Sequence, residues 1–206
     1  MCIRDRYWDL LNDGIGNTKN TKSLLMAALT PPAMSRGVRD DAAMAVSSGI
    51  RHIQFSQPTP QQTTAMEQYL LEMKEVPSPY LNADVLEAPK TDTDSCQKCH
   101  YPGVQRGTLN PSAGRGKVLF EGQAGCAICH PHPYFTSMQT VDGGLGTGIK
   151  YDIPSLVEVW RTAPYLHHGD ALSLKETLTD FNHLQLRGRT SDLTPSQLDD
   201  LLEYLR

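Results

Sequence analysis

Residues 126–130 read Cys126-Ala-Ile-Cys129-His130, and residues 96–100 repeat the pattern as Cys96-Gln-Lys-Cys99-His100. At this spacing two thiols can each add to one vinyl group on the same edge of a porphyrin, and the next imidazole is held beneath the iron. Each copy is therefore the attachment signature of a c-type haem. It makes four thiols haem-linking residues and two imidazoles proximal iron ligands: Cys96, Cys99, Cys126, Cys129, His100 and His130.

Two other kinds of site use the same residue types. Two Cys-x-x-Cys pairs can form a four-cysteine zinc site, and a single pair can form a redox disulfide. The stretch between Cys99 and Cys126 is longer than the roughly 15–20 residues usual in a zinc ribbon. A histidine also follows both pairs, although only 7 of the 206 residues are histidine. The sequence favours haem, and a structural zinc-binding module is the alternative.

The composition narrows the class of protein further. Hydrophobic residues make up 39% of the chain and aromatic residues 7%, which fits two small domains whose thin cores are completed by a buried haem. The net charge is −4 with no basic run, so nucleic acid is not an expected partner. No apolar stretch approaches the roughly 18 residues needed to cross a bilayer, so no membrane span is expected in this sequence.

The first six residues, Met1–Arg6, are unlike a secretory signal because they contain no apolar core. They resemble a translated adapter, so we expect a non-native leader over residues 1–6 in place of the natural N-terminus. Covalent haem is attached outside the cytoplasm. We therefore expect a periplasmic protein whose signal peptide is missing from this fragment.

An internal repeat organises the chain. Thr59-Pro60-x-Gln62 recurs 135 positions later as Thr194-Pro195-x-Gln197, and each copy leads to a Tyr-Leu pair. Thr at the N-cap and Pro at the first helical position predict a helix at both places. Residues 30–37 likewise correspond to residues 162–169 at an offset of 132, with Thr, Pro and Gly shared. These matches predict a duplicated domain of roughly 130 residues.

The repeat predicts four segments: a leader at 1–6, a first cytochrome-like unit at 7–75, a linker at 76–111 and a second cytochrome c domain at 112–206. On this interpretation the first unit's own haem motif lies upstream of residue 1. The motif at 96–100 has no counterpart in the repeat and falls within the linker.

Three further expectations concern the second domain. A helix should begin near Ser112, ahead of the second haem motif. Because the first and last helices of small cytochromes cross closely, we expect Gly116 or Phe120 to lie against Tyr204, with an ordinary amphipathic helix and incidental glycines as the alternative. A capping box at Ser173 should start another helix, with three apolar residues on one face: Leu174, Leu178 and Phe181. Pro-rich and Gly-rich sequence at 131–148 should form an extended loop.

A family resemblance rests on Ile153–Leu156, Trp160–Gly169 and Leu174–Glu176. These motifs are similar to the C-terminal half of the bacterial di-haem cytochrome c peroxidase superfamily, which includes methylamine-utilisation enzymes and propeller-linked c-type cytochromes. Residues 9–46 resemble the first domain of the propeller-linked members. One position departs from the pattern, because His168 stands where the family has Asp.

The resemblance implies a mainly α fold of two class-I cytochrome c-like helical units with long loops. It implies haem c at the second motif and at the 96–100 motif. Some family members have a calcium site between domains, for which Asp142 is a candidate ligand, although a turn residue is the favoured interpretation of Asp142. Some also have an upstream β-propeller domain, which is a candidate partner domain here.

The sixth iron ligand separates electron carriers from peroxidases, because a peroxidase haem needs an open or displaceable distal position. Met138 follows His130 too closely to reach the opposite face of the haem. His167 and His168 are the candidate distal ligands, or they hydrogen-bond near a propionate. Met34, in the equivalent loop of the first unit, is a candidate ligand for that unit's haem, with a core methionine as the alternative.

We therefore expect a c-type cytochrome that transfers electrons, with a redox partner protein or a small cytochrome as its partner. The alternative is a di-haem peroxidase that reduces hydrogen peroxide, in which His167 or His168 would be the catalytic acid–base group.

Overall fold

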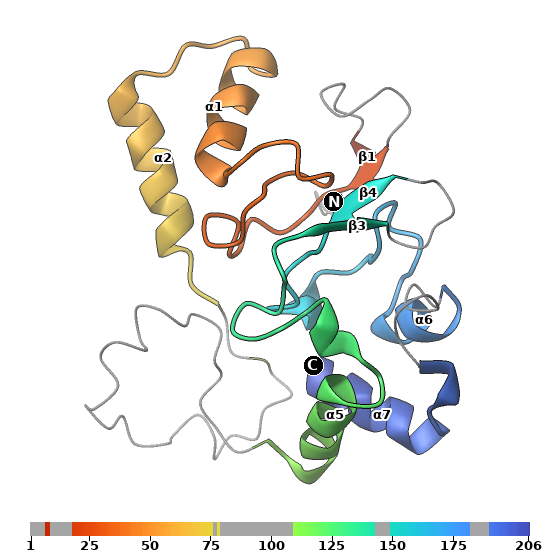
Figure 1. Cartoon of the computed structure of the whole chain (residues 1–206). Helices are drawn as coiled ribbons and strands as arrows, with labels where there is room; N and C mark the ends of the chain where they lie inside the picture. Colours follow the sequence, from red (N-terminus) through yellow and green to blue (C-terminus); the bar gives the residue numbers. More distant parts are fainter. Residues whose placement is uncertain (1–6, 9–17, 76–77, 79–108, 143–148, 182–189) are drawn as a thin grey trace, which may run out of the picture.

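The computed structural model describes residues 7–8, 18–75, 78, 109–142, 149–181 and 190–206. The motif at 96–100 and most of the predicted linker lie outside the described residues. Within the described residues, five α-helices and two small antiparallel sheets are joined by long loops (Figure 1). The helices are α1 (Ala42–His52), α2 (Pro60–Glu72), α5 (Pro111–Glu121), α6 (Leu174–Thr179) and α7 (Pro195–Leu205).

The two sheets contain two strands each. β1 (Tyr7–Trp8) pairs with β2 (Lys19–Asn20), and β3 (Thr140–Asp142) pairs with β4 (Lys150–Asp152). The part of the chain that the structure describes also forms three short 3₁₀ helices: Cys126–Ile128, Val159–Arg161 and Thr190–Asp192. The predicted dominance of helices and long loops is confirmed in this coarse sense, and the small sheets were not predicted.

α5, which directly precedes the second haem motif, and α7, at the C-terminal end of the chain, cross closely. A Cβ atom on Gly116 would lie 2.0 Å from the backbone oxygen of Asp200 and 2.8 Å from Cβ of Tyr204, so only glycine permits this approach. Phe120 packs edge-on against Tyr204 with ring centroids 5.3 Å apart. The predicted contact of Gly116 and Phe120 with Tyr204 is confirmed.

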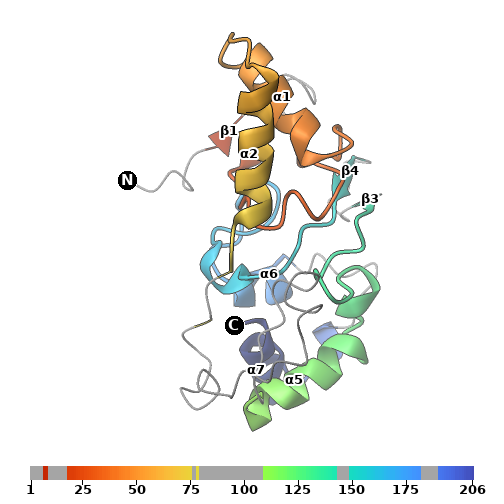
Figure 2. The ribbon, with the colours of Figure 1, turned by 90° about the vertical axis from the view of Figure 1, so that its left-hand side faces the viewer.

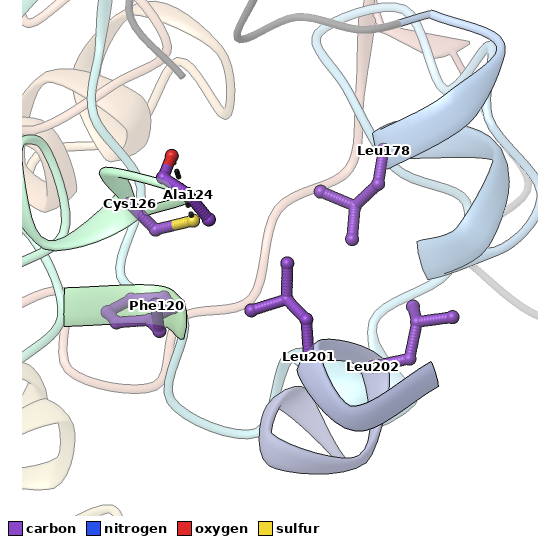
Figure 3. Close-up of a cluster of buried hydrophobic side chains, with 6 residues drawn as sticks. All are labelled: Phe120, Ala124, Cys126, Leu178, Leu201 and Leu202. Carbon is purple, nitrogen blue, oxygen red and sulfur yellow. Dashed lines mark hydrogen bonds between the residues drawn. The ribbon is translucent and has the colours of Figure 1, made fainter. Parts of the chain in front are cut away.

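We call residues 7–75 the first half of the molecule and residues 112–206 the second half. The buried core of the second half lies around that crossing (Figure 3). Its six buried members come from α5, α6, α7 and the segment that follows α5: Phe120, Ala124, Cys126, Leu178, Leu201 and Leu202. Ser173 is the N-cap of α6 as predicted, since Glu176 N donates to Ser173 Oγ at 3.1 Å, but the Glu176 carboxylate accepts from Leu172 N at 2.7 Å in place of the Ser173 nitrogen that a full capping box would use. The prediction that Phe181 shares a helix face with Leu174 and Leu178 is wrong, because α6 ends at Thr179.

The helices predicted from the repeated Thr-Pro-x-Gln are both present, and their first turns are alike. Thr59 and Thr194 are the N-caps of α2 and α7. In each helix the cap nitrogen donates to the Gln side chain at 2.9 Å, and the Gln nitrogen donates to the Thr hydroxyl at 3.3 Å.

The loops related by 132 positions share their backbone geometry as well. An isolated antiparallel bridge joins Ala33 to Arg39, and the matching bridge joins Tyr165 to Ala171. The third residue before each loop glycine has positive φ, +75° at Met34 and +69° at Leu166. The repeat seen in the sequence is thus also a repeat of local structure.

The two halves hold each other through equivalent bonds. Asn20 N, on β2, donates to His167 O at 2.8 Å, and Asp152 N, on β4, donates to Ser35 O at 3.0 Å. Asn20 and Asp152 are 132 positions apart, as are Ser35 and His167. In each case a strand residue of one half donates a hydrogen bond to a loop residue of the other half. This reciprocal pattern is that of a local two-fold pseudosymmetry.

Candidate haem site

The second haem motif forms a tight turn directly after α5. Gly125 has a φ of +67°, which glycine adopts at little cost, and it opens the 3₁₀ helix Cys126–Ile128. Cys129 N and His130 N both donate to Cys126 O, at 3.2 and 2.9 Å. The turn buries Cys126 and His130 and leaves Cys129 half-buried. Two thiols and an imidazole are thereby gathered within five residues.

His130 is held in one orientation by the backbone. Its Nδ1 lies 2.9 Å from the carbonyl oxygen of Phe135, and a carbonyl can only accept a hydrogen bond. The proton therefore sits on Nδ1, and Nε2 is the nitrogen whose lone pair can bind a metal. A backbone carbonyl behind a ligating histidine fixes its tautomer and increases its basicity.

The two thiols differ in their surroundings. Burial raises the pKa of the Cys126 thiol to about 11, so this group is neutral at physiological pH. Cys126 and Cys129 are both free cysteines. Within the described part of the chain, no group of three or more His, Cys, Asp or Glu side chains is placed to hold a metal ion.

Apolar side chains from three helices surround the buried thiol. Leu178 of α6 and Leu201 of α7 point toward one another beside Cys126, and Phe120 of α5 lies close to it (Figure 3). Phe135, whose carbonyl orients His130, packs edge-on against Phe120 with ring centroids 6.0 Å apart. Paired thiols, an oriented imidazole and an apolar surround together fit a covalently attached haem.

The two histidines predicted as distal groups lie side by side. His167 is 8% exposed, and its ring centroid is 4.7 Å from that of His168 and 4.3 Å from that of Tyr151. Its backbone oxygen accepts from Asn20 N, and Asn20 Nδ2 donates to Pro164 O at 2.6 Å. The structure thus fixes the loop that carries both histidines, while iron ligation by either stays a prediction.

The remaining candidates are placed as follows. Met34 is half-buried on the tight turn of the first half, where Gly37 N donates to Met34 O at 3.1 Å. Asp142 ends β3 and is exposed, so the calcium ion predicted there stays a prediction. The motif formed by Cys96, Cys99 and His100 lies outside the described residues.

Two contacts at or near the candidate site were not predicted from the sequence. The carbonyl of Phe135 orients His130, and the backbone of any residue could do this, so nothing in the sequence marks it. Asn20 bonds the loop of the second half through its backbone and its side chain. The repeat offered a signal for Asn20, because it aligns this residue with Asp152.

Comparisons with known proteins place this site in context. No family model matches the chain. Hydrazine synthase subunit gamma of Kuenenia stuttgartiensis is 26% identical over 97% of this chain and 67% of that protein. The methylamine utilization protein MauG of Methylorubrum extorquens is 31% identical over 35% of this chain, and the match spans 26% of MauG.

Solved structures show the same fold. A chain of the K. stuttgartiensis hydrazine synthase superposes with a TM-score of 0.75 at 22% identity, covering 97% of this chain and 75% of that one. A MauG-like protein associated with microbial copper homeostasis superposes with a TM-score of 0.61 at 15% identity, covering 91% and 72%. Together with the motifs, these similarities support a relationship to the MauG-like, di-haem cytochrome-like proteins.

Proposed function

We propose that this chain is a c-type cytochrome that transfers electrons in the periplasm through covalently bound haem. The observation that carries the proposal is the His130 Nδ1 bond to the Phe135 carbonyl, because it directs Nε2 as a ligand beside two free thiols. A haem bound here supplies one-electron redox chemistry.

Each residue around that haem has a distinct role in this proposal. Cys126 and Cys129 anchor it, His130 ligates it, and the Phe135 carbonyl keeps the imidazole basic. Buried Phe120, together with the leucines of α6 and α7, excludes water from one side. Low solvent access and a basic proximal ligand both tune the reduction potential. A second haem at residues 96–100 belongs to the proposal on sequence grounds alone.

The first test is a count of haems. The protein is co-expressed with the haem maturation system, and its visible spectrum is recorded oxidised and dithionite-reduced, with a pyridine haemochrome assay. Two haems per chain would support both motifs. A single haem that is lost in the Cys126→Ala/Cys129→Ala variant would mean that the 96–100 motif does not hold a haem. A colourless protein that binds zinc would overturn the proposal in favour of the zinc module.

The alternative function is reduction of hydrogen peroxide with electrons from a small cytochrome. It is favoured by the neighbouring rings of His167 and His168 on a loop that Asn20 holds in place, because an acid–base catalyst must be positioned in advance. A high-spin ferric band near roughly 620–640 nm, expected of an iron with an open or water-ligated distal site, together with peroxide turnover would favour this enzyme. Sharp low-spin bands without turnover would favour the carrier.

A protein partner fits the proposal, because one relative is by name the subunit of a larger enzyme. No described helix is both long and apolar enough to cross a membrane. The calcium ion and the upstream β-propeller implied by the family resemblance are kept as predictions.

A further inference from the structure

A buried carboxylate lies in the turn that precedes the 3₁₀ helix Val159–Arg161. Glu158 has a φ of +56°, and its side chain is only 2% exposed. Arg161 Nε donates a hydrogen bond to one carboxylate oxygen of Glu158, and Arg161 Nη2 forms an ion pair with the same oxygen. The guanidinium carbon also lies 5.9 Å from the ring centroid of Trp160. The negative charge is thus removed from water, whereas the side chain that balances it is 36% exposed.

The matching turn of the first half is built without charge. Met26 and Leu29 stand 132 positions before Glu158 and Arg161. Met26 is also buried, and it has a φ of +64°. Leu29 N donates to Met26 O at 2.8 Å, just as Arg161 N donates to Glu158 O at 3.1 Å. Two apolar side chains are therefore sufficient for this turn, and the ion pair has a role other than forming it.

Stability does not explain the charged pair either. Moving a carboxylate out of water costs free energy that an ion pair offsets only in part, and well-packed apolar side chains of similar size are often as stable or more stable. A buried charge has an effect that an apolar side chain lacks, because its electric field reaches neighbouring groups where the dielectric constant is low. The pair is therefore best explained by an electrostatic action on a nearby group.

The charged turn adjoins the candidate haem site. Ser155 Oγ donates to Tyr134 O at 2.7 Å, which joins the chain just before the turn to the loop that follows the haem motif. Leu156, two residues before Glu158, packs against the buried cluster that contains Cys126. The segment from β4 to α6, which contains the turn, lies between the α1–α2 pair and the α5–α7 pair (Figure 2). A redox cofactor attached at Cys126 would thus be the nearby group on which the pair acts.

We propose that the Glu158–Arg161 pair sets the reduction potential of the haem attached at the 126–130 motif. The inference rests on the proposed function, in which that motif holds a haem. Ferric haem carries one more positive charge than ferrous haem, so a nearby carboxylate favours the ferric form and a nearby guanidinium favours the ferrous form. Glu158 and Arg161 act in opposite directions, and the potential reflects their balance. The first half has Met26 and Leu29 at this turn and lacks this control.

The test measures the reduction potential of the haem-loaded full chain by spectroelectrochemistry, in a Cys96→Ala/Cys99→Ala background so that a single motif is followed. Glu158→Gln removes the negative charge at nearly constant size, and the potential should rise. Arg161→Gln removes the positive charge, and the potential should fall. In each variant we expect the ferric-to-ferrous ratio at a fixed applied potential to change at least about threefold. Opposite signs separate an electrostatic role from a structural one, because both variants disrupt the same contact.

Two matched controls accompany the measurement. Lys175→Gln removes a positive charge of the same half that is exposed to water and therefore screened, so the potential should stay unchanged. The double variant Glu158→Met/Arg161→Leu installs the residues of the matching turn. Its potential should lie between those of the two single variants, and its midpoint of urea unfolding should equal or exceed that of the wild type.

Three outcomes would overturn the proposal. Shifts of the same sign in both single variants, or no shift in either, would mean that the pair exerts no electrostatic control over the haem. A double variant with a lower unfolding midpoint and an unchanged potential would mean that the pair is a structural brace. A wild-type protein without haem would refute the proposed function together with this inference, and the pyridine haemochrome assay distinguishes that outcome from an unchanged potential.

Discussion

Gly116 carries the closest approach between α5 and α7, and its substitution has a predictable cost. The first atom of any side chain would lie 2.0 Å from the backbone oxygen of Asp200, and a backbone atom cannot move aside without separating the helices. We expect Gly116→Ala to lower the free energy of unfolding by about 1–3 kcal/mol. Urea unfolding followed by circular dichroism measures the change.

The chain offers a matched control two residues earlier. A Cβ atom on Gly114 would meet nothing within 4 Å. Gly114→Ala should therefore leave stability unchanged or raise it by about 0.5–1 kcal/mol through the helix propensity of alanine. Equal effects of the two substitutions would show that the crossing at Gly116 is looser than the structure has it.

Residue-level reasoning from the sequence succeeded where the contact is steric. The close crossing of the first and last helices in small cytochromes predicted the contact of Gly116 and Phe120 with Tyr204, and the haem turn predicted from the paired thiols and histidine stays a prediction. It could not find the Phe135 carbonyl, because every residue has the same backbone acceptor. His167 and His168 were singled out as functional histidines, but a sequence cannot show that their rings adjoin.

Among the elements, α2 and α7 start with the same cap but should respond differently when it is removed. Thr194→Ala and Thr59→Ala each remove the bond from the Gln nitrogen to the Thr hydroxyl, a local loss of about 1 kcal/mol. α7 contributes Leu201 and Leu202 to the buried core, whereas α2 buries only Leu70 among its described residues. Thr194→Ala should therefore lower the global free energy of unfolding by about 1 kcal/mol.

Thr59→Ala should instead act locally. We expect faster amide hydrogen exchange within α2 and little change in the global unfolding midpoint, because a peripheral helix can open without the core. Native-state hydrogen exchange of both variants separates these effects. An equal fall in the global midpoint would contradict the view that α2 is energetically peripheral.

Helices that begin with a recognisable N-capping motif were predicted from the sequence, and the short strands were not. Thr-Pro-x-Gln predicted α2 and α7, and the Ser173 capping box predicted α6. The strands contain two or three residues each, too few for alternation to show. α1 was missed although its N-cap Asp41 accepts a hydrogen bond from Met44 N at 2.7 Å.

At the scale of the whole molecule, the two halves depend on the reciprocal bonds of Asn20 and Asp152. The Asn20 side chain donates to Pro164 O, whereas its counterpart is a carboxyl group whose Oδ1 is buried without a hydrogen-bond partner among the described residues. Burial raises the pKa of Asp152 to about 7, and the nearby positive charge of Lys22 offsets part of this shift. The neutral carboxylic acid is the form that the fold prefers.

Because the pKa of Asp152 differs between the folded and unfolded states, the free energy of unfolding depends on pH. The folded pKa of about 7 lies above the unfolded value of roughly 3.9, so the folded state binds the proton more tightly. Stability is then highest at low pH within this window and falls as pH rises from about 4 to about 7. Because Asp152 is partly exposed, we expect a contribution of about 1–2 kcal/mol, below the full linkage value.

Asp152→Asn tests the argument, because it installs the residue that already occupies the equivalent position in the first half. Asparagine cannot ionise, so the variant should lose the decline in stability between about pH 4 and about pH 7 and be more stable than the wild type at pH 8. Urea unfolding at several pH values measures both. Asn20→Asp is the converse variant and should introduce a comparable decline. Parallel pH profiles for wild type and Asp152→Asn would mean that the carboxyl group is solvated and that the two halves are not joined as closely as their matching hydrogen bonds indicate.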